Sequence, residues 1–170
     1  MKVTHVPAHA THDLRRRVLR DGRADAEVVF PGDDAPTTVH FGAFPSETPP
    51  PCSGGDGGDA RRAPLAIASL YLSPLKDQSL SNGVPSDQQY QFRGMASAPD
   101  VRGLGYADAI MRAMIAHLRS QAPSGTGRLL WCNARLGAIG FYERFGMRTV
   151  SPEFLITGVG PHVVMTLVVE

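Results

Sequence analysis

The chain has 170 residues with a formal net charge of +1, and 42% of its residues are hydrophobic. This length and composition predict a single domain, residues 1–170, with a buried core, and the balanced charge gives no general attraction to nucleic acid or to an acidic membrane. No stretch is apolar enough to span a bilayer, and the N-terminal residues lack the apolar segment of a signal peptide.

The beginning of the chain predicts a short strand followed by a helix. Residues 3–6 read as the strand, and Thr11 is placed to cap a helix that continues through Leu19 and stops at Gly22. Four arginines crowd this helix, and we expect a solvated face with one side-chain stem along the core; the alternative is a basic lip to a substrate cleft. These residues are Arg15, Arg16, Arg17 and Arg20.

Residues 30–36 form a cluster of turn-forming residues that contains two neighbouring carboxylates, Asp33 and Asp34. We expect both carboxylates to serve the turn through Asx-type hydrogen bonds. The alternative is that they bind a cationic substrate.

Two strands with long connections follow this turn. Residues 38–44 and 63–72 have strand patterns that suit an antiparallel pair. The connections, at about residues 45–62 and 73–87, are rich in glycine, proline and polar residues. Such composition predicts two flexible loops.

The rest of the chain alternates strands with helices. Strand patterns end near Ser97 and cover residues 128–133, and a helical pattern follows each of them. Short strand patterns close the chain, the last of them at residues 162–169. This order suits a mixed α/β fold with a mostly antiparallel sheet of about seven strands and helices on both faces.

A glycine-containing loop lies between the strand ending near Ser97 and the next helix. The first N–H groups of a helix have no intrahelical partner, and the positive end of the helix dipole points the same way, so the geometry predicts a bound anion such as a phosphate. A Walker loop is excluded because Tyr106 follows Gly105, and a dinucleotide fingerprint is excluded because Asp108 replaces its third glycine. What remains is the pattern Arg-x-x-Gly-x-Ala at residues 102–107.

A second motif follows the strand at residues 128–133. It has the form Ala-x-x-Phe-Tyr-x-x-x-Gly-Met, from Ala138 to Met147. Together the two motifs resemble those of the GNAT superfamily of acetyl-CoA-dependent N-acetyltransferases, in which a phenylalanine usually stands at the last position. The resemblance covers residues from about 90 to 147 and implies the GNAT fold.

The resemblance also implies where acetyl-CoA binds. In the family the sheet splays between the strand ending near Ser97 and the strand at 128–133, the pantetheine arm bonds to the backbone of the first strand, and the pyrophosphate contacts the glycine loop. Many members carry an asparagine at position 135, where this chain has arginine. The cofactor contacts expected here are Met95, Ala96, Ser97, Arg102, Gly103, Leu104, Gly105, Tyr106 and Ala107, together with Asn133 and Arg135.

The resemblance assigns chemistry to one tyrosine in particular. Attack of an amine on a thioester forms a tetrahedral oxyanion, which a backbone N–H near Met95 or Ala96 could stabilise. Tyr142 stands where the family places a phenol near the sulfur, and a phenol suits a general acid for the departing thiolate. The alternative is that Tyr142 is an edge of the core with its hydroxyl in water.

A general base is less evident, because the strands flanking the loop offer no carboxylate. The candidates are His162, at the start of the last strand, Glu153 and His40. The intrinsic pKa of an imidazole suits proton transfer from an ammonium group. For His162 a hydrogen-bonded structural role is the alternative, for Glu153 a surface role, and water could also carry the proton.

We therefore expect an acyltransferase that moves an acetyl group from acetyl-CoA to a primary amine of a small molecule or peptide. The alternative is a catalytically silent acetyl-CoA- or CoA-binding sensor or interaction module. No metal, nucleic-acid or membrane partner is expected, because the His and Cys residues do not cluster and the arginines are not interleaved with aromatics. A homodimer is the default expectation. With Cys52 and Cys132 unsuited to a disulfide framework, we expect a cytoplasmic protein in which the Cys132 thiol is buried and inert.

Overall fold

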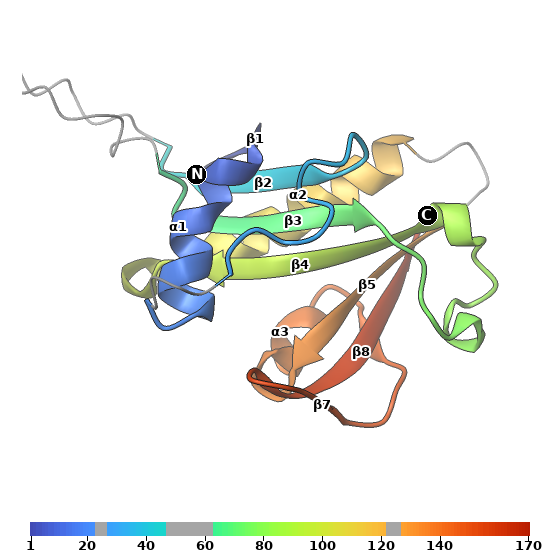
Figure 1. Cartoon of the computed structure of the whole chain (residues 1–170). Helices are drawn as coiled ribbons and strands as arrows, with labels where there is room; N and C mark the ends of the chain where they lie inside the picture. The colour runs from blue at the N-terminus through green and yellow to red at the C-terminus, as the bar shows by residue number, and fades with distance from the viewer. Residues whose placement is uncertain (23–26, 47–62, 122–126) are drawn as a thin grey trace, which may run out of the picture. The chain divides into compact units, whose positions relative to one another are not determined.

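The computed structural model of the chain describes residues 1–22, 27–46, 63–121 and 127–170 (Figure 1). These residues form two compact units, each built from two stretches of chain. Unit 1 contains Met1–Ser69 and Gly94–Ala113, and unit 2 contains Leu70–Arg93 and Met114–Glu170. Nearly all of the loop predicted at residues 45–62 lies outside the described residues, as does Cys52.

The strands follow the order β1-β2-β3-β4-β5-β8-β6, and β7 also pairs with β8. Strands β4 and β5 are parallel, whereas β1 with β2 and β8 with β5, β6 and β7 are antiparallel. The mixed, mostly antiparallel sheet is therefore confirmed. The strands are β1 (Lys2–Val6), β2 (Val39–Phe44), β3 (Ala66–Leu72), β4 (Gln89–Ser97), β5 (Arg128–Arg135), β6 (Arg148–Thr149), β7 (Phe154–Ile156) and β8 (Gly160–Val169).

The first helical segment of unit 1 changes its winding along its length. A 3₁₀ turn at Ala8–Thr11 leads into α1 (His12–Leu14), which continues as a π-helix at Arg15–Leu19. The segment stops at Gly22, which has φ +73 and donates its N–H to the carbonyl of Arg16 at 3.0 Å, as predicted. The predicted cap is wrong: Thr11 has helical dihedrals, and its hydroxyl donates to the Ala8 carbonyl at 2.7 Å.

Helix α2 (Tyr106–Gln121) begins in unit 1, and Figure 1 shows its start and α1 on opposite sides of the strands of this unit. The α1 side of the core consists of apolar residues from α1, β3, β4 and the turn after β4. They are Leu14, Ile67, Ala96, Ala98 and Val101, with Val18, Leu19, Leu65 and Tyr106 packed against them. This core therefore fixes the end of β4 and the start of α2, the two elements that flank the glycine loop.

In unit 2, β5 and β8 pair along eight positions, from Arg128 with Val169 to Arg135 with His162. Beyond β5, a 3₁₀ turn at Leu136–Ala138 leads into α3 (Ile139–Glu143). Strands β6, β7 and β8 close the chain, and β7 pairs antiparallel with the start of β8. None of the helices in the described ranges has the length and apolarity needed to cross a membrane.

The segment predicted as a flexible loop at residues 73–87 differs from that expectation. Leu75 and Val84 are buried against Leu129 and Trp131 of β5. Gln89 is also buried, and its side chain accepts the Leu75 N–H at 2.8 Å and donates to the Val84 carbonyl at 2.7 Å. The segment also contains two 3₁₀ turns, Gln78–Leu80 and Ser86–Gln88. The buried Gln89 amide therefore holds in place a segment whose composition alone predicts a flexible loop.

Candidate functional site

The glycine loop of unit 1 has the backbone geometry that its sequence predicts. Gly103 and Gly105 have φ values of +79 and +83, in the left-handed region that favours glycine. The Ala109 N–H donates to the Gly105 carbonyl at 3.0 Å, which makes Gly105 the residue from which α2 starts. The N–H groups of Tyr106, Ala107 and Asp108 therefore lie ahead of the first intrahelical hydrogen bond.

The surroundings of this loop leave room for an anion. A side chain added at Gly103 would have no heavy atom within 4 Å, and Leu104 is 63% exposed. Arg102 is exposed as well. The acidic residue in the first turn of α2, Asp108, is paired with Arg112 at 2.7 Å, which offsets its charge. The loop thus fits a pyrophosphate, with backbone donors and the positive end of a 16-residue helix aimed at it.

The end of β4 carries the three residues predicted to bond the pantetheine arm, Met95, Ala96 and Ser97. They follow Gly94, which has φ +66 inside the strand. A left-handed glycine within a strand is typical of a β-bulge, which re-aims the backbone groups that follow it. We did not single out Gly94 from the sequence, although a glycine within a strand pattern is a signal for a bulge.

In unit 2, β5 presents Asn133 and Arg135 on its exposed face, and Cys132 and Ala134 on its buried face. Arg135 lies directly opposite His162 of β8, and directly opposed residues of an antiparallel pair share a face. The structure therefore brings three of the predicted site residues, Asn133, Arg135 and His162, to one face of unit 2. The parallel pairing of β4 with β5 covers residues 89–91 against 129–131 and goes no further in the described part of unit 2.

Tyr142 of α3 is 7% exposed and lies between two aromatic rings. The centroids of Phe92 and Phe141 are 5.3 and 5.2 Å from its own, both in edge-on geometry. Burial raises the pKa of the Tyr142 hydroxyl, Cys132 raises it further, and Arg135 acts in the opposite direction. The phenol is therefore a neutral donor at physiological pH, and within the described residues its hydroxyl has no hydrogen-bond partner.

The buried Cys132 thiol is unreactive for a related reason. Burial raises its pKa, so the reactive thiolate form is suppressed at physiological pH. This agrees with the expectation of an inert thiol. Elsewhere in the described part of the chain, no group of three or more His, Cys, Asp or Glu residues could hold a metal ion.

The three candidate bases have different environments. His162 is 4% exposed, and its Nδ1 lies 2.8 Å from the Gly160 carbonyl. A carbonyl can only accept, so Nδ1 carries the proton and the neutral ring keeps a lone pair on Nε2, which has no partner in the described ranges. Glu153 is exposed just before β7. His40 is buried with both nitrogens hydrogen-bonded, to Ser69 and to the Asp33 carbonyl, so it is not available as a base.

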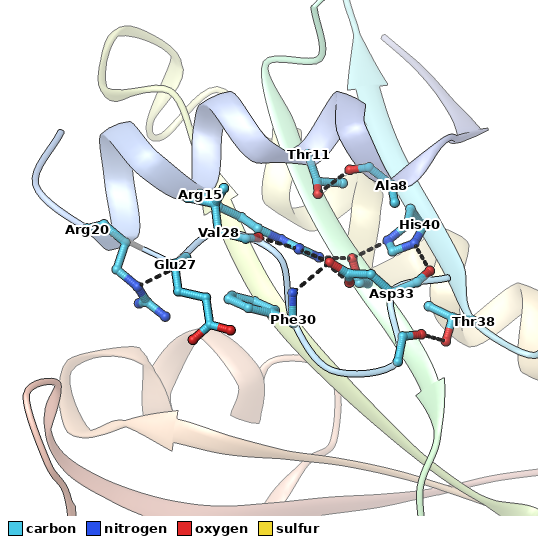
Figure 2. Close-up of polar contacts among 12 residues, drawn as sticks. Ala8, Thr11, Arg15, Arg20, Glu27, Val28, Phe30, Asp33, Thr38 and His40 are labelled. Carbon is cyan, nitrogen blue, oxygen red and sulfur yellow. Dashed lines mark hydrogen bonds and ion pairs between the residues drawn. The ribbon is translucent and has the colours of Figure 1, made fainter. Parts of the chain in front are cut away.

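The arginine-rich helix also differs from its prediction. Arg17 pairs with Asp13 at 2.8 Å on the surface, as a solvated face requires. Arg15, however, is fully buried and paired with Asp33 (Figure 2). Asp33 also accepts the Phe30 N–H at 2.8 Å, which confirms its turn role. The alternative that Asp33 binds a cationic substrate is wrong, because its carboxylate is already bonded to a buried guanidinium.

Comparisons with known proteins agree with this geometry. The family model "Acetyltransferase (GNAT) family" matches residues 61–147. Over 166 residues the chain is 26% identical to the uncharacterized N-acetyltransferase YitI of Bacillus subtilis (strain 168), an alignment that covers 97% of this chain and 94% of the relative.

Solved structures show the same fold. An acyl-CoA N-acyltransferase from Pseudomonas aeruginosa matches with a TM-score of 0.66 and 17% identity, covering 98% of this chain and 99% of its own. An aminoglycoside 6'-N-acetyltransferase complexed with coenzyme A matches with a TM-score of 0.64 and 9% identity, covering 100% and 98%. The chain belongs to the acetyltransferase (GNAT) family.

Proposed function

We propose that this acetyltransferase moves an acetyl group from acetyl-CoA to a primary amine of a small molecule or peptide. The observation that carries the proposal is the glycine loop, in which Gly103 and Gly105 are both left-handed directly before α2. This geometry offers backbone N–H donors to a pyrophosphate, which is the charged group of coenzyme A that a helix N-terminus suits. Coenzyme A is also bound by the aminoglycoside 6'-N-acetyltransferase that shares the fold.

The reaction forms one bond and breaks another. The amine nitrogen attacks the acetyl carbon, the C–N bond forms, and the C–S bond of the thioester breaks. The oxyanion formed on the way needs a fixed donor, and we assign this role to the backbone after the Gly94 bulge, at Met95 or Ala96. Backbone donors held by strand and core packing need little reorganisation during the reaction.

Two side chains of unit 2 handle the protons in this proposal. Tyr142 keeps its proton at physiological pH and donates it, or a hydrogen bond, to the departing thiolate. His162 has the opposite character, because its free Nε2 lone pair can accept the proton that the amine loses. Glu153 is the competing base, since its carboxyl group is exposed. We assign the acid to Tyr142 and the base to His162.

The test is thiol release from acetyl-CoA with pooled amines and peptides, run beside a thermal-shift titration with acetyl-CoA alone. The proposal predicts a thermal shift with acetyl-CoA and thiol release with at least one pool, from which the acceptor can be traced. A shift without release from any pool would favour a silent CoA-binding sensor. No shift would contradict the assignment of acetyl-CoA as the donor.

A further inference from the structure

A buried ion pair in unit 1 lies next to Gly94 of β4, the residue before the predicted cofactor contacts. Arg15 is 0% exposed, and its guanidinium contacts Asp33 at two points, Nη1 to Oδ2 at 2.5 Å and Nη2 to Oδ1 at 3.0 Å. Nη1 also donates to the Val28 carbonyl, and Nη2 donates to the Ser69 hydroxyl, both at 2.8 Å. The guanidinium lies 4.0 Å from the centroid of the Phe30 ring. Figure 2 shows Arg15 of the π-helix segment meeting Val28, Phe30 and Asp33 of the loop that follows it. Ser69 belongs to β3.

His40 closes this network on its far side. Its Nε2 lies 3.0 Å from the Asp33 carbonyl, which can only accept, so Nε2 carries a proton. Ser69 accepts from Arg15 and lies 2.6 Å from His40 Nδ1, so in the neutral ring its hydroxyl proton points to Nδ1. The hydrogen bonds that join Arg15, Ser69, His40 and the Asp33 carbonyl therefore each have a defined donor and acceptor. A network of this kind is rigid, because moving one member leaves a buried polar group unsatisfied.

The network lies against β4 at Gly94. A side chain added there would lie 3.0 Å from Phe30 Cε2 and 3.2 Å from Arg15 Nε. The guanidinium and the aromatic ring therefore occupy the space that a side chain would take, directly over the left-handed backbone of the bulge. Met95 and Ala96, one of whose N–H groups we assign to the oxyanion, follow Gly94 without a break.

The position of this ion pair next to Gly94 indicates a role beyond stabilising the fold. A buried ion pair is often no more stabilising than a well-packed apolar pair, so the stability of the fold does not by itself account for an ion pair at this position. The ion pair does fix orientation, because a two-point guanidinium–carboxylate contact holds both side chains in one geometry. The backbone packed against these oriented side chains is the Gly94 bulge, which precedes the predicted cofactor-binding residues.

We propose that Arg15 and Asp33 are positioning residues for acetyl transfer, which hold the Gly94 bulge so that the backbone N–H that follows it, of Met95 or Ala96, keeps its aim at the thioester carbonyl. The inference rests on the proposed function. It separates two roles within unit 1: the Gly94 bulge governs the transfer step, whereas the glycine loop binds the pyrophosphate. Loss of the pair should therefore lower kcat and leave the KM for acetyl-CoA nearly unchanged.

The test compares Asp33→Asn with Asp34→Asn in the full chain. The first substitution removes the charge that orients Arg15, and the second removes an exposed carboxylate from the same turn. We expect Asp33→Asn to lower kcat about tenfold or more, since misplacing catalytic groups by about 1 Å costs up to about 100-fold, with KM for acetyl-CoA changed less than about twofold. Asp34→Asn should match the wild type in both constants.

A second variant covers the case in which Asp33→Asn fails to fold. Arg15→Met with Asp33→Leu replaces the pair by apolar groups, a change that folded proteins often tolerate, and it should show the same fall in kcat. If either folded variant keeps kcat within about twofold of the wild type, or lowers kcat and raises KM together, the positioning role is wrong.

A further readout does not depend on activity. Amide chemical shifts and hydrogen exchange of Gly94, Met95 and Ala96 should change in Asp33→Asn and stay unchanged in Asp34→Asn, while the amides of Gly103 and Gly105 stay unchanged in both. If the wild type transfers no acetyl group, the proposed function fails, and these amide signals still decide whether the ion pair holds the bulge. Unchanged signals at residues 94–96 would overturn the inference.

Discussion

The candidate site residues differ in kind between the two units. In unit 1 they offer backbone: a glycine loop with positive φ angles, the start of α2 and a strand that contains a left-handed glycine. In unit 2 they offer side chains: a buried phenol on α3 and a buried imidazole on β8. Backbone donors suit recognition of a fixed cofactor, whereas titratable side chains suit proton transfer. Substitutions in the two units should therefore affect different constants.

The largest effect is expected at Tyr142. Tyr142→Phe removes the hydroxyl and keeps the ring that packs against Phe92 and Phe141. Loss of a general acid should lower kcat by about 100-fold or more, with acetyl-CoA affinity retained. Steady-state kinetics and a binding titration measure the two quantities. Tyr90→Phe is the matched control, because that hydroxyl accepts from Arg128 within unit 2, and it should change stability more than turnover. Equal kcat values for Tyr142→Phe and the wild type would remove the acid assignment.

A smaller loss is expected at His162, since water can replace part of a missing base. His162→Asn retains an N–H donor for the Gly160 carbonyl and removes the Nε2 lone pair, so kcat should fall about tenfold, less than a base usually contributes because water replaces part of it. Glu153→Gln tests the competing assignment. The kcat values of the two variants decide between them: the fall should appear in His162→Asn and be absent in Glu153→Gln. The reverse pattern would move the base to Glu153.

For unit 1 the sharpest comparison sets Gly103 against a matched glycine of unit 2, Gly158. Gly103 and Gly158 have φ values of +79 and +74, and an added side chain would contact nothing within 4 Å at either position. Replacement by alanine should cost each about 1–2 kcal/mol of backbone strain. Only Gly103→Ala should also weaken acetyl-CoA binding, by several-fold, with kcat at saturation unchanged. A calorimetric titration checks this. Equal acetyl-CoA affinities for the two variants would show that the loop does not bind the pyrophosphate.

The smallest effect concerns alkaline stability. Because burial raises the pKa of Tyr142 above the value of about 10 expected in the unfolded chain, the neutral phenol contributes stability that is present below pH 10 and is lost as the pH rises further. Tyr142→Phe cannot ionise, so its stability should decline less between pH 9 and pH 11 than that of the wild type, by the measure of thermal unfolding. Parallel decline of both proteins would contradict the raised pKa.

The sequence predicted the parts of this molecule that local chemistry determines. The glycine loop between a strand and a helix, the end of β4 at Ser97 and the stop at Gly22 follow from residue types and their immediate neighbours. The burial of Arg15 could not be predicted in this way. Its partners, Asp33 and Ser69, are 18 and 54 residues away, and only the pairing of distant elements brings them together.

The ordered structure of residues 73–87 was also not predicted, because it depends on a contact with a residue outside the segment. Its composition is that of a loose loop, and the residue that fastens it, Gln89, belongs to the next strand and is an unremarkable polar residue in the sequence. The free Nε2 of His162 is likewise visible only in the structure, because it depends on the contact of Nδ1 with the Gly160 carbonyl. Resemblance identified Tyr142, whereas the absence of a hydroxyl partner in the described residues had to come from the fold.

The most direct test measures two constants on three proteins: acetyl-CoA affinity and amine-dependent thiol release for the wild type, Gly103→Ala and Tyr142→Phe. The account predicts that Gly103→Ala loses affinity and keeps turnover at saturation, and that Tyr142→Phe loses turnover and keeps affinity. If both variants lose both constants in equal measure, or if the wild type releases no thiol with any amine, the division between a backbone cofactor site and side-chain chemistry is contradicted.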